Sequence, residues 1–430
     1  MADQLTFLFM PESAYGPTNN CIGIGNILRQ QGHRVVFAAE ASWAGKLEAM
    51  GFTEDLVDLA PPPPADEPEQ AAGQFWTDFI RETAPVFRLP TIEQLAGFVQ
   101  PTWQALVDGA MYCQPQLEAI IGRQRPDVII EDNVNCFPAL LTAGVPWVRI
   151  MSCQPLEVKG PNVPPAFSGY PIADRTGWAE YVAEYDRTHR PMWTAYDEWV
   201  RSCGAPGLPD LEFIHESGDL NLYVYPEVID YTLDRPLNPT WHRLDSSVRA
   251  TDAAFEVPES LRDLPGSLIY LSLGSLGSAD VELMRRFVDV LSRTPHRYIV
   301  SKGPQHDQIE LAPNMWGAPQ VPQTTVLPLV DLVITHGGNN TTTECFHFGK
   351  PMILLPLFWD QYDNAQRVHE TGHGIRLTTY EFDEAELHGA IETLLANTTL
   401  RDRMATQAET IRGRQGTAVA ATLIEQLARR

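Results

Sequence analysis

Polar residues with a regular arrangement follow the apolar run at residues 331–335. They read H-G-G-N-N-T at residues 336–341, where a helical pattern begins. Glycine lets the backbone approach a ligand closely, and the N–H groups at the start of a helix favour a phosphate. Asn340 and Thr341 can add side-chain hydrogen bonds to such a group. Glu344, one turn further along, is placed to accept both hydroxyls of a ribose, as the acidic residue of dinucleotide sites does.

A second pair of polar residues, Asp360 and Gln361, follows the next apolar run at residues 351–358. Ligands of parallel sheets bind beyond the carboxyl ends of the strands, so this pair would face the same ligand as the first group. An acid beside an amide suits a polyhydroxylated ligand. Taken singly, H-G-G also suits a plain strand-to-helix turn and D-Q a helix N-cap, but their order and spacing together favour a ligand site.

A third polar segment, A-Y-G-P-T-N-N at residues 14–20, follows the first apolar run of the chain. A loop in this place of an α/β protein often carries reactive groups. Yet Pro17 in its middle has no side-chain chemistry, and no histidine lies between residues 1 and 32. Carboxylates that could serve as a base in place of a histidine are Asp132, at the end of the apolar run 126–133, and more weakly Glu12 and Glu131. Structural roles compete with these: Asp132 as the cap of the following helix, Tyr15 and Asn19 as residues that only shape the loop, and Asn20 as a helix N-cap.

These segments need elements that position them, and both halves of the chain alternate apolar runs with helical patterns. The first half predicts strands at 5–10, 34–40, 126–133 and 144–152, with a helix at 20–32. The second half predicts strands at 267–275, 297–303, 331–338 and 351–358, with helices at 279–293, 341–348 and 361–371. This order favours a parallel sheet in each half, so we expect an α/β fold of two domains with a cleft between them.

The boundary between the two halves is predicted from composition. Residues 232–266 are rich in proline and aspartate and show no apolar period. We therefore expect an N-terminal domain at 1–240, a linker at 241–266 and a C-terminal domain at 267–395. A helical tail of mixed charge follows at 396–430.

The composition excludes several classes of function. The 430 residues carry 31 basic and 55 acidic side chains, which gives a net charge of −24. This acidic excess disfavours a general role in binding nucleic acid or an anionic membrane. The six cysteines are scattered without C-x-x-C spacing, as expected of free thiols in a reducing compartment. No apolar run approaches the roughly 20 residues of a membrane span, and no signal peptide is evident, so a cytoplasmic protein is expected.

The C-terminal half closely resembles the nucleotide-sugar signature of the family-1 glycosyltransferases, which include antibiotic-pathway enzymes. That signature reads W-x-P-Q, then H-x-G-x-N-S-x-x-E, then P-x-x-x-x-D-Q. This chain has Q-V-P-Q at 320–323, H-G-G-N-N-T-T-T-E at 336–344 and P-L-F-W-D-Q at 356–361, preceded by S-L-G-S at 272–275. The resemblance implies the GT-B fold, in which two Rossmann-like domains face a cleft and a C-terminal helix crosses back.

The resemblance also implies roles for individual donor-site residues. The diphosphate would be held by His336, Gly338, Asn340 and Thr341 with help from Ser275; the ribose by Glu344; the sugar by Asp360 and Gln361; and the base by the Val321 backbone, with Gln320 and Gln323 beside it. Gln320 stands where the family usually has a tryptophan that stacks on uracil, while Trp316 lies four residues early. UDP is therefore the expected nucleotide, with dTDP as the alternative. The family needs no metal, and no tight metal-ligand spacing occurs here.

The family's first loop usually reads G-H-x-x-P, and its histidine takes a proton from the acceptor hydroxyl. Pro17 occupies that position here, whereas the aspartate that orients the histidine matches Asp132. Three explanations compete. The acceptor needs no strong base, as an amine, an aromatic N–H, an acidic phenol or a carboxylate would not; or another group serves, Asp132 first; or the protein only binds a sugar nucleotide. The complete donor signature argues against the third.

An aromatic-rich helical region at 75–112 reads either as core packing or as one wall of an acceptor pocket. Together with the resemblance it predicts acceptor contacts at Tyr15, Asn19, Trp76, Phe79 and Trp359. The expected protein is an inverting, metal-independent transferase that moves a hexose, glucose above all, from a UDP-sugar to a small apolar acceptor, without a cofactor and as a monomer or homodimer. A sugar-nucleotide epimerase of the same fold and a non-catalytic binding protein are the alternatives.

Overall fold

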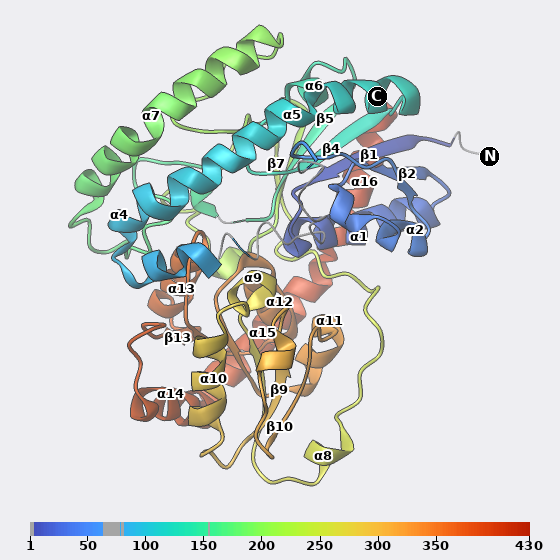
Figure 1. The fold of residues 1–430 in the computed structure, drawn as a ribbon. Coiled ribbons are helices and arrows are strands. Elements are labelled where there is room, and N and C mark those ends of the chain that lie inside the picture. The colour runs from blue at the N-terminus through green and yellow to red at the C-terminus, as the bar shows by residue number, and fades with distance from the viewer. Residues whose placement is uncertain (1–3, 63–77, 79–80, 154) are drawn as a thin grey trace.

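The chain folds into two parallel β-sheets, one above the other in Figure 1. The computed structural model describes residues 4–62, 78, 81–153 and 155–430. The upper, N-terminal sheet has the order β3-β2-β1-β4-β5-β6-β7, and the lower, C-terminal sheet has the order β10-β9-β8-β11-β12-β13. The predicted α/β class with two parallel-sheet domains is therefore confirmed.

The N-terminal sheet is built from short buried strands. Their bounds are β1 (Thr6–Pro11), β2 (Arg34–Phe37), β3 (Thr53–Glu54), β4 (Val128–Asp132), β5 (Trp147–Met151), β6 (Leu220–Tyr223) and β7 (Trp241–Arg243). The helices of this half are α1 (Tyr15–Gln30), α2 (Lys46–Ala49), α4 (Thr91–Gln94), α5 (Gln100–Gln124), α6 (Pro138–Leu141) and α7 (Trp178–Ser202), with short helical turns at η1 (Ala41–Trp43), η2 (Ala84–Arg88), η3 (Leu95–Val99), η4 (Pro155–Glu157) and η5 (Glu227–Ile229).

The C-terminal sheet has the same construction. Its strands are β8 (Leu268–Ser272), β9 (Arg297–Ser301), β10 (Met315–Ala318), β11 (Leu332–Thr335), β12 (Met352–Leu354) and β13 (Gly374–Arg376). Its helices are α9 (Gly274–Gly277), α10 (Val281–Leu291), α11 (Gln323–Val326), α12 (Asn339–Phe348), α13 (Gln361–Glu370), α14 (Glu384–Ala396) and α15 (Thr398–Arg414), with turns at η6 (His306–Gln308) and η7 (Leu327–Leu329).

Each sheet is covered on both faces, which is why its strands read as continuous apolar runs. On one face of the N-terminal sheet, Phe7 and Phe9 of β1 pack with residues of α1 and of α16 (Gly416–Ala428). On the other face, Leu8 and Met10 pack with residues of α5 and α7. Alternate side chains of one strand therefore serve two separate cores.

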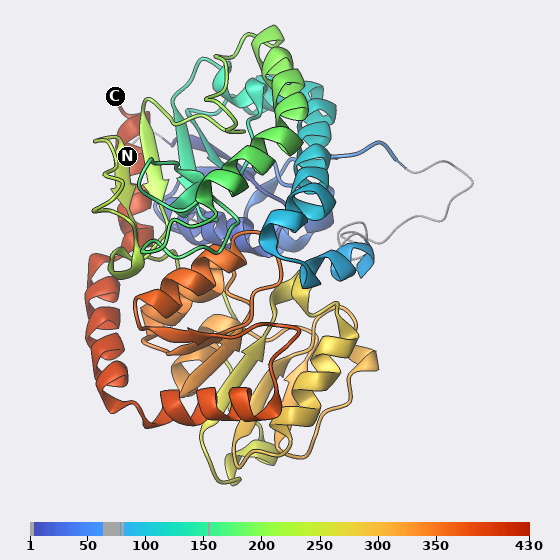
Figure 2. The ribbon, with the colours of Figure 1, turned by 90° about the vertical axis from the view of Figure 1, so that its left-hand side faces the viewer.

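Two short segments differ from their sequence-based description. Residues 241–243, placed at the start of the linker by composition, form β7 and pair with β6 at the edge of the N-terminal sheet. Residues 259–262 of the same stretch form a short helix, α8 (Glu259–Arg262). In the tail, α15 packs on α12 and α16 packs on α1, so the chain passes from the lower domain to the upper one, as Figure 2 shows.

The first predicted helix begins five residues earlier than expected. Ala14 is the N-cap of α1, so Tyr15, Gly16 and Pro17 belong to its first turn rather than to a loop. Proline is tolerated there because the first N–H groups of a helix have no partner within the helix. The predicted role of Asn20 as an N-cap is therefore wrong, since it lies in the second turn.

The two sheets present comparable edges to each other. In an open parallel sheet, ligands bind beyond the carboxyl ends of the strands where the strand order reverses. That point lies between β1 and β4 in the upper sheet and between β8 and β11 in the lower sheet. Asp132 ends β4, and α12 begins a few residues after β11. Asp132 and the start of α12 thus lie at these two points.

The docking of α16 can be tested at its first residue. A Cβ on Gly416 would lie 2.2 Å from the Leu244 carbonyl oxygen and 2.8 Å from that of Ser246. Because both are backbone atoms, we expect Gly416→Ala to lower the free energy of unfolding by about 1–3 kcal/mol, measured by denaturant titration. Gly413→Ala in α15 is the matched control: a Cβ there meets nothing within 4 Å, and the change should stabilise the protein. Equal unfolding free energies for Gly416→Ala and the unchanged protein would contradict this packing.

Candidate active site

The turn between β11 and α12 is shaped by the ring of His336. A Cβ at Gly338 would lie 2.5 Å from the His336 Nε2 atom, and one at Gly274 would lie 2.8 Å from the same atom. A side chain at either position would have to displace the His336 ring, and the predicted approach of the Gly338 backbone to a ligand stays a prediction. Burial lowers the pKa of His336 to about 4, although a hydrogen bond to the Ser272 backbone opposes the shift. The imidazole is therefore neutral at pH 7.

Three predicted donor residues form one hydrogen-bonded group beside α12. The side-chain amide of Gln323 donates to the Thr341 hydroxyl (3.2 Å) and to the Glu344 carboxylate (2.6 Å). Arg249 donates to the other Glu344 oxygen at 3.1 Å. Burial raises the pKa of Glu344, while Arg249 and Gln323 lower it. Arg249 was not predicted, because it lies in the stretch that composition marked as a linker.

Asp360 and Gln361 stand at the start of α13, as predicted. Their side chains make different hydrogen bonds. The Asp360 carboxylate accepts from the Asn364 side chain at 2.9 Å, and it remains half-buried. The Gln361 side-chain carbonyl accepts from the N–H groups of Leu357 (3.0 Å) and Phe358 (3.3 Å). Gln361 therefore shapes the loop before α13, and Asp360 is the freer of the two.

Asp132 lies at the carboxyl end of β4 and is almost fully enclosed, with 2% of its surface exposed. Its Oδ1 accepts from the Ser152 hydroxyl at 2.7 Å, and its Oδ2 is buried without a partner. Burial raises its pKa well above the usual value, and the charge of Glu12 raises it further. The next helix, α6, is capped by Phe137, so the alternative role of Asp132 as a helix cap is wrong.

The two weaker carboxylate candidates are occupied elsewhere. Glu12 accepts from the Ser13 hydroxyl (2.8 Å) and from the Ala14 N–H (2.9 Å), directly before α1. Glu131 is fully buried and accepts from the indole N–H of Trp147 at 2.9 Å. Because neighbouring residues of a strand point to opposite faces, Glu131 and Asp132 lie on different sides of the sheet.

The start of α1 touches the C-terminal domain. Asn20 donates to the Asn340 side-chain oxygen (3.1 Å), and the Asn340 amide donates to the Gly16 carbonyl (2.9 Å). The hydroxyl of Tyr15 accepts from the Gln320 amide at 3.2 Å. Asn340 and Gln320, two predicted donor residues, thus bind the opposite domain.

The remaining predicted contacts divide into three cases. Pro17 is buried in the first turn of α1, and Asn19 and Val321 are half-buried. The ring of Trp359 lies 5.1 Å from that of Trp103 and 4.4 Å from that of Phe167 between ring centres, so it joins an aromatic cluster across the domains. Trp76, Phe79 and the side chain of Ser275 lie outside what the structure describes.

Carboxyls from the two domains affect one another's pKa values where the domains meet. Burial is the largest cause of the raised pKa of Glu157, Arg149 opposes it, and Asp360, Asp132 and Asp363 add to it, giving a value of about 8. Burial also raises the pKa values of Asp360 and Asp363 to about 7. The gap between the domains therefore favours protonated or cation-paired carboxyls at neutral pH.

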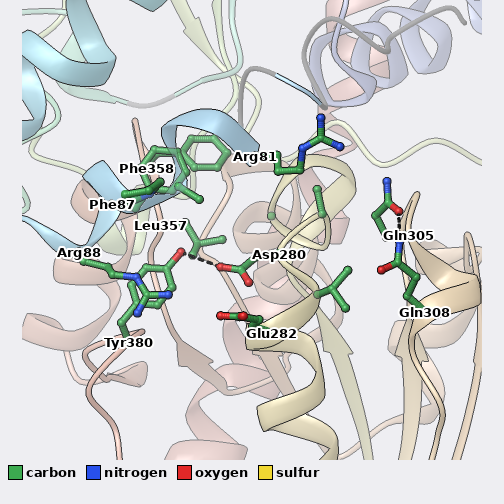
Figure 3. Close-up of a pocket in the computed structure, with 15 residues that line it drawn as sticks. Arg81, Phe87, Arg88, Asp280, Glu282, Gln305, Gln308, Leu357, Phe358 and Tyr380 are labelled. Atoms are coloured by element: carbon green, nitrogen blue, oxygen red, sulfur yellow. Dashed lines mark hydrogen bonds between the residues drawn. The ribbon is translucent and has the colours of Figure 1, made fainter.

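A hollow of about 480 Å³ lies between η2 and the start of α10. Figure 3 shows its apolar side, made by Phe87 and Phe358, and its polar side, where the Tyr380 hydroxyl donates to Asp280 at 3.2 Å. Arg88 lies over the Tyr380 ring, 4.5 Å from its centre. None of the predicted donor residues lines this hollow.

Within the described ranges, no helix is both long and apolar enough to cross a membrane. No group of three or more His, Cys, Asp and Glu side chains in those ranges is arranged to hold a metal ion. All six cysteines are free, in agreement with the sequence. The cytoplasmic location and the oligomeric state stay predictions.

Charging these carboxyls should weaken the fold as the pH rises to about 8. The folded-state pKa values of Glu131 and Glu157, about 8, and of Asp360 and Asp363, about 7, exceed the unfolded values of about 4. The unfolded chain therefore loses its protons first, and stability falls from the unfolded pKa values up to the folded ones, where the fall ends. Buried histidines such as His336 change the stability of the fold only below pH 6.5, because above this pH they are neutral in both the folded and the unfolded chain.

We therefore expect the melting temperature to fall between pH 6.5 and pH 8. Glu157→Gln removes one of these groups and should make the fall smaller, as differential scanning calorimetry would show. A melting temperature that stays constant or rises over this range would contradict the pKa assignment.

Known proteins are similar to this chain in sequence and in fold. Residues 285–426 match the family model described as Erythromycin biosynthesis protein CIII-like, C-terminal domain. The chain is 25% identical to demethyllactenocin mycarosyltransferase of Streptomyces fradiae, covering 98% of this chain and 86% of that protein. It is 23% identical to the sterol 3-beta-glucosyltransferase of Eremothecium gossypii, over 91% of this chain but only 32% of that longer protein. The solved structure of the glycotransferase of kitacinnamycin aligns with a TM-score of 0.71 at 20% identity, covering 99% of this chain and 100% of the other.

The structural likeness confirms the expected GT-B fold. The sequence likenesses run through α12, which carries Thr341 and Glu344, and the family model covers most of the C-terminal domain. The chain therefore has the GT-B fold, and its sequence is similar to those of antibiotic-type glycosyltransferases.

Proposed function

We propose that the protein transfers a hexose from a nucleoside-diphosphate sugar to a small apolar acceptor, with inversion at the anomeric carbon. Glucose from UDP is the donor we expect, and a dTDP-sugar is the alternative. The observation that carries the proposal is the hydrogen-bonded group of Gln323, Thr341 and Glu344 beside the start of α12. The names of the two relatives differ in the sugar, a glucosyl and a mycarosyl group, so both sugars belong in the test.

Each part of a nucleotide sugar has a complementary group in the C-terminal domain. The free N–H groups at the start of α12 suit the diphosphate. The Glu344 carboxylate, fixed by Arg249 and Gln323, suits the two ribose hydroxyls. Asp360, half-buried at the start of α13, suits the hydroxyls of the sugar. We expect the nucleoside, the diphosphate and the sugar to occupy these three points in that order.

The start of α12 also suits the chemistry of the leaving group. Negative charge develops on the diphosphate as the glycosidic bond breaks, and groups aimed at that charge lower the barrier. The ten-residue helix provides about half a positive charge at its start, together with unpaired N–H groups. We therefore propose a reaction without a metal or another cofactor. A neutral His336 can donate or accept a hydrogen bond there without adding charge.

Asp132 is the group that we propose to take the proton from the acceptor. Ser152 holds its Oδ1, which leaves Oδ2 as the atom without a partner. Its raised pKa makes it a stronger base than an exposed aspartate, once it is ionised. Pro17 leaves no imidazole at the family's usual position. Because Asp132 is 2% exposed, the domains must separate before an acceptor can reach it.

The apolar part of the acceptor has a candidate place in the hollow of Figure 3. Its volume of about 480 Å³ falls within the usual range for small-molecule sites. Phe87 and Phe358 give it an aromatic wall, and Phe358 stands two residues before Asp360. An acceptor that rests there would lie beside the proposed sugar position.

The decisive experiment is incubation of the pure protein with UDP-glucose or dTDP-glucose and a panel of apolar alcohols, phenols and amines, followed by mass spectrometry. A new glycoside is the expected product. A changed sugar nucleotide without a glycoside would indicate an epimerase. Binding of UDP-glucose without turnover would indicate a non-catalytic protein, and either result would overturn the proposal.

Two substitutions in α12 test the donor site. Thr341→Ala and Glu344→Gln should each raise the dissociation constant for UDP about ten- to a hundredfold, because each removes a hydrogen bond to a charged or ribose group. Isothermal titration calorimetry measures this directly. Thr343→Ala is the matched control, since its hydroxyl only donates to the Asn340 carbonyl within the helix (3.0 Å). Unchanged UDP affinity in both variants would contradict the assignment of the donor site.

Asp132→Asn tests the proposed base. With an alcohol as acceptor, we expect kcat to fall about 10²- to 10⁴-fold, because the amide cannot take a proton. With an amine as acceptor the loss should be small, since a neutral amine attacks without prior deprotonation. Glu131→Gln is the control, one residue away on the other face of the sheet. Full activity of Asp132→Asn on alcohols would exclude Asp132 as the base.

A further inference from the structure

Asn339, the first residue of α12, joins the two domains through its side chain. Its amide nitrogen donates to the carbonyl oxygen of Ser152 (2.6 Å) and to that of Val224 (3.0 Å). These carbonyls directly follow β5 and β6, two neighbouring strands of the N-terminal sheet. Only 5% of Asn339 is exposed. Because both partners are acceptors, the nitrogen must face them, and the orientation of the amide is fixed by chemistry.

The same residue stands between the two carboxylates assigned to the reaction. Burial raises the pKa of Asp360, and the nearby backbone N–H of Asn339 lowers it in part. The hydroxyl of Ser152, whose carbonyl accepts from Asn339, donates to Asp132. A continuous path of contacts therefore runs from Asp360 through Asn339 and Ser152 to Asp132.

We propose that Asn339 is a positioning residue that holds Asp132 and Asp360 in register when the domains meet. This inference rests on the proposed function, in which Asp132 serves the acceptor and Asp360 the sugar. Proximity of two reacting groups depends on their mutual placement, and a shift of about 1 Å can cost a hundredfold in rate. Asn339 fixes that placement with one nitrogen whose two hydrogens meet two strands.

The chemistry of this contact favours an asparagine. Two backbone carbonyls at one place need two N–H donors from one short side chain, which a hydroxyl cannot supply. The buried Asn339 Oδ1 has no partner, so the residue carries a desolvation cost that its role in the fold of α12 does not require. The neighbouring Asn340 makes a different contact, to α1, so the two asparagines hold the helix start against two parts of the N-terminal domain.

Asn339→Ala and Asn339→Asp test the inference with UDP-glucose and the acceptor that gives the most glycoside in the panel. We expect kcat to fall about ten- to a hundredfold in both, the equivalent of one or two buried hydrogen bonds. The dissociation constant for UDP should stay unchanged, because Gln323, Thr341 and Glu344 are left intact. This division between kcat and donor affinity separates positioning from a general loss of structure.

Asn221→Ala is the matched control. Asn221 is also fully buried, lies in β6, and its amide donates to the Ser217 carbonyl (2.8 Å) and the Thr240 hydroxyl (2.9 Å) away from the C-terminal domain. It should lower the melting temperature without lowering kcat. An unchanged kcat in Asn339→Asp would overturn the inference, and so would a parallel loss of UDP affinity. Failure of the proposed function differs from both, since the unchanged protein would then form no glycoside.

Discussion

The start of α12 is the point on which the rest of the site depends. A helix start offers N–H groups that have no partner within the helix, and these are the groups that suit a diphosphate. Two asparagine side chains keep that start against the N-terminal domain without using those N–H groups. Asn339 binds the ends of β5 and β6, and Asn340 binds α1. One helix can therefore hold the donor and set the distance between the domains at once.

Buried carboxyls impose the second constraint. Asp132, Glu157, Asp360 and Asp363 come from both domains, and burial raises the pKa of each. Bringing them together costs free energy when they are charged, and the nearby Arg149 offsets it at Glu157 only in part. These carboxylates are stronger bases than exposed ones, because a carboxylate in a low-dielectric environment binds a proton more tightly. This gives a chemical reason why a site without a histidine at position 17 can still accept a proton.

Much of this arrangement could be read from the sequence, for identifiable reasons. The strands could be predicted because they are buried on both faces and read as apolar runs. The start of α12 could be predicted because glycine, asparagine and threonine follow such a run in an order that favours a helix start. The start of α1 was placed too late, since A-Y-G-P-T resembles a loop although proline is tolerated in a first helical turn. Contacts between residues far apart in the sequence could not be predicted from it. Arg249 contacts Glu344, 95 positions away, and Asn339 contacts Ser152, 187 positions away. Trp359 packs on Trp103 and Phe167, contacts that the sequence did not reveal, and its contact with the acceptor stays a prediction.

The central claim is that the start of α12, facing Asp132 across the domains, is the donor site. A crystal structure with UDP bound tests it most directly. We predict the diphosphate at the N–H groups of Asn340 and Thr341, with the ribose hydroxyls on Glu344. UDP bound in the hollow between Arg81 and Arg88, with no contact to α12, would contradict the account.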